Sequence, residues 1–149
     1  MFKSLGKLFG GGSKPGPVNA TDSVLGTLRW TDNDQLWEAT VTVGDKTVDF
    51  LIAGDTGPNR TLIAHAHDIV RTFPDFHRMV TAFLADETAQ QKHLSRFSDE
   101  IRQLSIEHVC LLWPDRPDDG MIYFRGPDEN RAWRCDYIAR KPKGLGFDS

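Results

Sequence analysis

Cysteine is scarce in this sequence: its 149 residues include only two, Cys110 and Cys135. Both lie inside apolar and aromatic runs, and no Cys-x-x-Cys pair is present, which excludes a disulfide framework and the zinc or thiol-redox motifs built on such pairs. Two buried, reduced thiols are typical of proteins of the cytosol, so we expect a cytoplasmic protein. The N-terminal residues lack the apolar core of about 7–15 residues that a secretory signal contains, and we expect no such signal.

Positive charge and long apolar runs are missing as well. The chain has 18 Lys and Arg residues against 21 Asp and Glu residues, a net charge of −3. Non-specific binding of nucleic acid needs clustered basic side chains, so we expect no nucleic-acid partner. No apolar run approaches the roughly 20 residues that a membrane-spanning helix needs. With 39% hydrophobic residues, the sequence predicts a globular protein with a core of its own.

Residues 1–17 differ in composition from the rest of the chain. Residues 10–17 are almost entirely Gly, Pro and Ser, as in a linker, so we expect a single domain over residues 18–149. Four apolar side chains in residues 1–9 follow helical spacing: Phe2, Leu5, Leu8 and Phe9. This amphipathic pattern is compatible with contact to an anionic membrane, with a frayed tail, or with docking on the chain's own domain or on a neighbouring copy.

Alternation of apolar and polar residues over 36–43, and again over 48–52, predicts two half-buried strands. Gly44 and Asp45 between them suit a type II′ turn, which needs glycine at its first central position. A two-residue loop here places Val41 opposite Val48. It also pairs Ala39 with Phe50 and Trp37 with Ile52. All three pairs are apolar and share one face, so pattern and turn chemistry predict the same hairpin.

The middle of the chain changes to a helical period. Apolar residues recur at helical spacing and predict helices over about 60–73 and 74–92, with Pro74 in the first turn of the second helix. Ser98 suits the N-cap of a short helical turn that follows.

Further apolar segments predict the remaining strands. They lie at 25–30, 106–113, 121–125 and 132–140, whereas we expect residues 141–147 to be irregular. Three strands, two helices and three strands therefore follow one another, and the short turns within each group favour antiparallel pairing. The sequence predicts an α+β fold: a two-layer sandwich in which a mainly antiparallel sheet carries both helices on one face.

Several segments together resemble a bacterial family known only as domain of unknown function 2262. They are residues 25–30, 36–39, 98–107 and 132–138, within a region of about 24–140. At the closing strand the family has Gly-His, whereas this chain has Arg134 and Cys135. The resemblance implies a cytosolic bacterial protein without a settled activity. Small families of this kind often accompany toxin genes as immunity or accessory proteins, which is an argument from analogy.

The His65-Ala66-His67-Asp68 segment has the residue types of a metal site. Helical residues two positions apart point about 200° away from each other, so His65 and His67 cannot bind one ion. His65 and Asp68 share a face, and His77 could add a ligand, but two helical ligands do not make a site. We therefore expect no metal and no cofactor.

An acidic loop is the second candidate for chemistry. Asp115, Asp118 and Asp119 crowd one turn-rich connection and have the oxygen ligands that a hard cation prefers. A small metal-dependent hydrolase centred on this loop is therefore an alternative function. A different acid–base set would combine Glu107, His108 and Asp136.

The final strands provide the best candidate for a binding surface. If Ile122, Phe124, Cys135 and Tyr137 face the helices, their neighbours face the other way. Those neighbours are Tyr123, Arg125, Arg134 and Asp136. Tyrosine and arginine are enriched at the energetic centres of protein interfaces. We expect these four side chains to form an exposed partner-binding face.

These observations favour a non-catalytic binding module with a protein partner. The concrete form is an immunity-type protein that neutralises a toxin by stoichiometric association, and the acidic domain would attract a basic partner. The alternatives are the hydrolase and a peripheral membrane accessory protein that uses residues 1–9. The sequence leaves the oligomeric state open.

Overall fold

The computed structural model describes residues 19–148. Its sheet has eight strands that follow one another in chain order. They are β1 (Asn19–Asp22), β2 (Gly26–Thr31), β3 (Leu36–Val43), β4 (Lys46–Ile52), β5 (Ser105–Leu111), β6 (Gly120–Arg125), β7 (Ala132–Ile138) and β8 (Lys141–Asp148). The expectations for residues 1–17 concern a segment that lies outside the described residues.

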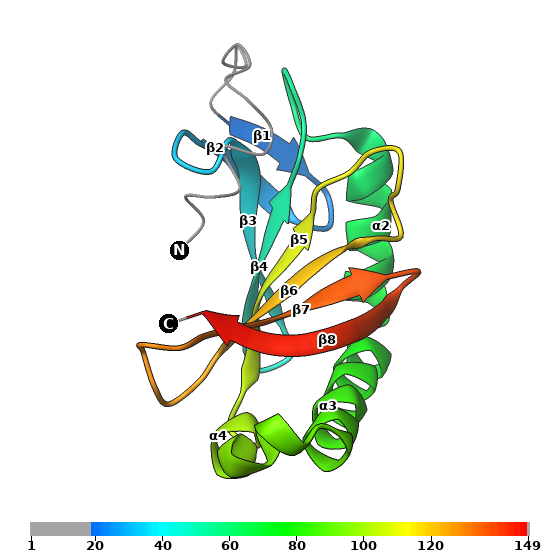
Figure 1. The fold of residues 1–149 in the computed structure, drawn as a ribbon. Coiled ribbons are helices and arrows are strands. Elements are labelled where there is room, and N and C mark those ends of the chain that lie inside the picture. The colour runs from blue at the N-terminus through cyan, green and yellow to red at the C-terminus, as the bar shows by residue number, and fades with distance from the viewer. Residues whose placement is uncertain (1–18, 149) are drawn as a thin grey trace.

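The helices lie between β4 and β5 in the chain. They are α2 (Arg60–Arg71), α3 (Phe73–Gln90), the 3-10 helix η1 (Lys92–Phe97) and α4 (Ser98–Ile101). Because the chain crosses over through these helices, β4 and β5 are parallel, while the other neighbouring strands are antiparallel. The fold is thus α+β, and α2 and α3 run along one side of the twisted sheet (Figure 1).

The β3–β4 hairpin is confirmed residue by residue. Val41 pairs with Val48, and the other two expected pairs are present as well. Both valines are buried. Gly44 has a φ of 65°, and Asp45 is not among the residues with positive φ, which is the combination that a type II′ turn requires.

Two strands were not expected. β1 contains one apolar residue, Ala20, and so shows no apolar alternation, and β8 lies where we expected irregular chain. The β7–β8 hairpin cannot be recognised from its turn residues. Ala139 and Arg140 both have positive φ (52° and 64°), at positions where Gly or Asn is usual. The irregularity expected for residues 141–147 is therefore wrong: Lys141 pairs directly with Ile138.

The break between the two long helices is confirmed. α2 ends at Arg71, and α3 begins at Phe73 with Pro74 in its first turn. The expected N-cap at Ser98 is wrong, because η1 runs directly into α4 and gives Ser98 helical backbone angles. An N-cap needs an extended backbone at that position.

The two faces of the sheet are distinguished by their contacts. Tyr137 on β7 touches His65 of α2 and Phe76 of α3, so its side of the sheet faces the helices. We call the opposite side the far face; it carries Leu51 and Cys110, which pair across β4 and β5. No helix within residues 19–148 is both long and apolar enough to cross a membrane.

Candidate functional site

A polar concave site lies where the two parallel strands end. A pocket of about 480 Å³ opens beyond the carboxyl ends of β4 and β5, beside the start of α2. It is lined by Trp30, Gln35, Ala53, Gly54, Asp55, Thr56, Gly57, Asn59, Leu112 and Pro114. The carboxyl ends of parallel strands are where ligands bind in open α/β sheets, because the connecting loops gather there.

One wall is the tight loop from β4 to α2. Gly54 is required there, since a Cβ would lie 2.0 Å from the Gly57 carbonyl oxygen. The backbone N–H of Asn59 donates to the Ala53 carbonyl (2.9 Å), which closes the loop. The Asn59 side chain accepts from Thr61 and Leu62 and so caps α2. The loop is therefore held from both ends.

The opposite wall comes from the β2–β3 turn. Gln35 has a φ of 55°, and its backbone N–H donates to Thr31 over 2.7 Å. Trp30 is fixed by an edge contact with Trp37 (5.7 Å between ring centroids) and by its indole N–H, which donates to Asp32. Non-glycine residues with positive φ are concentrated at functional sites, because the surrounding structure must hold them there.

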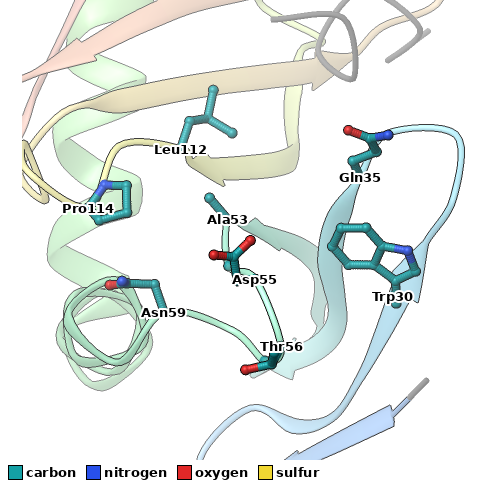
Figure 2. Close-up of a pocket in the computed structure, with 10 residues that line it drawn as sticks. Trp30, Gln35, Ala53, Asp55, Thr56, Asn59, Leu112 and Pro114 are labelled. Carbon is teal, nitrogen blue, oxygen red and sulfur yellow. The ribbon is translucent and has the colours of Figure 1, made fainter. Parts of the chain in front are cut away.

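A single charge dominates the pocket. Asp55 is the only ionisable residue among the described residues of the lining, and its exposed carboxylate has no hydrogen bond or ion pair with them or with any other residue of 19–148. Figure 2 shows Asp55 near the middle of the pocket, with Trp30 and Gln35 on one side and Asn59 on the other. The arrangement offers a hydrogen-bond acceptor of negative charge, an amide and an aromatic ring. Such a site favours a cationic group with a flat or aliphatic body.

The four residues expected on an exposed face do share one side of the sheet. Tyr123 pairs with Arg134, and Asp136 pairs with Met121, all on the far face. The expected exposure of Tyr123 is wrong, because its side chain is only 7% exposed. Burial raises the pKa of Tyr123 to about 12. The far face is thus covered at this strand, which sequence alternation alone does not reveal.

The two arginines of that set are already paired. Arg125 donates to Glu107 over 2.8 Å, and Arg134 donates to Asp148 over 3.1 Å. Asp136 is exposed. Both arginines therefore have part of their charge satisfied within residues 19–148, whereas Asp55 in the pocket has no such partner among these residues.

The acidic loop holds a neighbouring turn. Asp118 accepts from the side chain of Arg140 (2.7 Å), and Asp119 accepts from the backbone N–H of Ala139 (2.8 Å). The bond from Arg140 keeps the pKa of Asp118 below its usual range. Asp115 is exposed and does not take part in these contacts. Two of the three carboxylates thus support the strained β7–β8 turn.

The histidine segment of α2 meets the same loop. His65 is buried: its Nε2 lies 3.1 Å from the Tyr137 hydroxyl and its Nδ1 lies 3.4 Å from Asp118. Burial lowers the pKa of His65, because the charged imidazolium loses hydration. His67 lies elsewhere, 2.7 Å from Asp22. Within residues 19–148 no group of three or more His, Cys, Asp or Glu side chains is arranged to hold a metal ion.

The acid–base set of Glu107, His108 and Asp136 is only partly assembled. The His108 ring lies 3.2 Å from Glu107 and 3.5 Å from Asp49. Asp136 is on β7, two strands away from β5. The structure therefore brings Asp49 to His108 in place of the expected Asp136.

Sequence reasoning missed the pocket residues. Residues 53–59 lie between the predicted strand at 48–52 and the predicted helix at about 60–73, and Trp30 ends the predicted strand at 25–30. Nothing in the sequence pattern links these two segments. The available signal was the pair of helices between two strand groups, which requires a crossover and favours one parallel strand pair. Comparison with known proteins adds no assignment: no family model, curated protein or solved structure matches the chain.

Proposed function

We propose that the chain is a non-catalytic binding module that associates with a basic protein partner, in the stoichiometric manner of an immunity-type protein. The observation that carries this proposal is the Asp55 carboxylate in the pocket beside Trp30, which has no ion pair or hydrogen bond within residues 19–148. A lysine or arginine side chain of the partner would enter the pocket, pair with Asp55 and lie against the indole ring. A cation over a tryptophan face gains about 0.5–1 kcal/mol at an exposed site.

The charge of the domain supports a basic partner. Residues 18–149 contain 15 basic and 21 acidic side chains, a net charge of −6. An acidic surface speeds the encounter with a basic protein and disfavours acidic competitors. The pocket adds local recognition to this general attraction, because the described residues of its lining include no Lys, Arg or His side chain that would repel a cation.

A titration with three small probes tests the proposal. N-acetyl-arginine amide, N-acetyl-lysine amide and the neutral arginine isostere N-acetyl-citrulline amide are titrated into the full-length protein, and backbone and indole NMR signals are followed. We expect the two cationic probes to shift the signals of Trp30 and of the 53–59 loop, and citrulline to shift them far less. Asp55→Asn should weaken arginine binding about fivefold, close to 1 kcal/mol.

The matched control removes a carboxylate elsewhere. Asp45→Asn lies in the exposed β3–β4 turn and should leave the titration unchanged. Equal shifts with citrulline and arginine, or equal affinity of the Asp55→Asn protein, would contradict a cation site in this pocket. The Asp55→Asn protein can then be used to test whether binding of a basic partner protein depends on this carboxylate.

A further inference from the structure

A continuous row of paired residues crosses the far face of the sheet and starts in β1, the first described strand. From β1 to β7 the row is Asn19, Arg29, Glu38, Leu51, Cys110, Met121 and Asp136. Its centre is apolar, and its two ends are polar. A sheet face exposed to water normally carries polar side chains along its whole width.

The centre of this face is buried. Leu36, Leu51 and Cys110 are each 0% exposed. Their side of the sheet is opposite the one that contacts α2 and α3, so the described helices do not account for this burial.

We infer that residues 1–9 of the same chain pack on the far face, with their apolar stripe against Leu51 and Cys110. The position where the preceding chain joins β1 supports this occupant. Asn19 lies at the β1 end of the row, and β5 is four strands away, which is about 19 Å at the usual strand spacing. Residues 10–18 can span about 30 Å when extended, so the linker is long enough.

Charge complementarity favours the same segment. Residues 1–17 contain three lysines and no acidic residue, whereas the rest of the chain has a net charge of −6. Glu38, Asp49 and Glu107 are on or beside the far face and are only partly exposed. Lysines on the outer side of the segment would lie within reach of these carboxylates while its apolar side covers the sheet.

The two cysteines provide a built-in reporter. Cys110 lies on the far face and Cys135 on the helix face, and both are 0% exposed. Burial raises the pKa of both thiols, so neither reacts readily in the folded protein. Loss of the proposed contact should expose Cys110 and leave Cys135 covered.

The experiment measures alkylation of each thiol by N-ethylmaleimide in the full-length chain, with the modified site located by mass spectrometry. We expect Leu5→Asp to accelerate modification of Cys110 about tenfold or more and to leave Cys135 unchanged. Leu5→Ala should give an intermediate rate. Ser13→Asp in the linker makes the same change of charge and should behave as the wild type.

Three results would overturn the inference. Modification of Cys110 at the wild-type rate in Leu5→Asp would show that the segment does not cover it. Equal acceleration of both thiols would indicate general opening of the fold. Protection of Cys110 that decreases on dilution of the wild-type protein would assign the covering segment to a second copy.

Discussion

Neighbouring residues of β6 show that side chains are buried on both faces of the sheet. Phe124 is 3% exposed on the helix side, and Tyr123 is 7% exposed on the far face. Arg125, the next residue on the far face, has a side chain that is 72% exposed and paired with Glu107. Burial therefore ends between Tyr123 and Arg125, at the end of the strand.

Substitutions at these three positions should separate the packed residues from the exposed one. Phe124→Ala should lower the free energy of unfolding by about 3–5 kcal/mol, and Tyr123→Ala by about 2–4 kcal/mol, because each removes a buried ring. Arg125→Ala should cost less than about 1 kcal/mol, since exposed ion pairs contribute little. Urea unfolding monitored by circular dichroism gives the three values. A Tyr123→Ala protein as stable as the wild type would contradict the packing of this ring.

At the scale of single elements, the β7–β8 turn is the clearest departure from ordinary chemistry. Ala139 and Arg140 both adopt the left-handed backbone that a type I′ turn requires, without the usual Asn-Gly pair. Contacts to the β5–β6 loop hold the turn, since Asp118 and Asp119 accept hydrogen bonds from it. The turn therefore depends on side chains that lie 20 and 22 positions before it in the sequence.

Replacing Ala139 should reveal the strain of this turn. Ala139→Asn should stabilise the protein by about 0.5–1 kcal/mol, because asparagine tolerates the left-handed region better than alanine. The control is Ala64→Asn on the exposed side of α2, which should destabilise the helix by several tenths of a kcal/mol. Thermal unfolding of both variants decides the matter, and a lower melting temperature for Ala139→Asn would argue against strain at this position.

At the scale of the whole molecule, His65 connects segments that are far apart in the sequence. It joins α2 to Tyr137 on β7 and lies beside Asp118 of the β5–β6 loop. Arg140 extends the network to Asp68, 3.5 Å away. The neutral imidazole is the form that fits this buried position, since burial lowers the pKa of His65.

The stability of the whole fold should therefore depend on pH through this residue. In the unfolded chain His65 titrates near 6.5, whereas in the folded protein its pKa is lower, so the unfolded state binds more protons between these two values. The free energy of unfolding should decrease as the pH falls from about 6.5 toward the folded pKa, and level off below it. Urea unfolding at about pH 7.5 and 5.5 measures the decrease.

Two variants isolate the contribution of His65. His65→Gln should lose less stability on acidification than the wild type, because it has no proton to gain. His93→Gln, on the exposed side of η1, should retain the wild-type dependence. The same acid-induced loss in His65→Gln as in the wild type would place the pH dependence on other groups.

Features that depend on neighbouring residues follow directly from the sequence. Alternation over 36–52 with Gly44 at the turn specifies a hairpin in a single register, because a shift of one residue would move every apolar side chain to the wrong face. Pro74 ends one helix and begins the next through its own backbone restriction. Strong local signals of this kind predict elements well.

How distant segments meet depends on the packing of the whole chain and is seen only in the fold. The parallel pairing of Phe50 with Val109 joins strands almost sixty residues apart, and it brings the Ala53–Asn59 loop, Trp30 and Leu112 to one pocket. The tertiary structure also places Asp118 against Arg140, and it buries Tyr123 on a face that the alternation pattern assigned to solvent. Periodicity reports which side chains share a face of one element, whereas the partner of that face is chosen by packing of the whole chain.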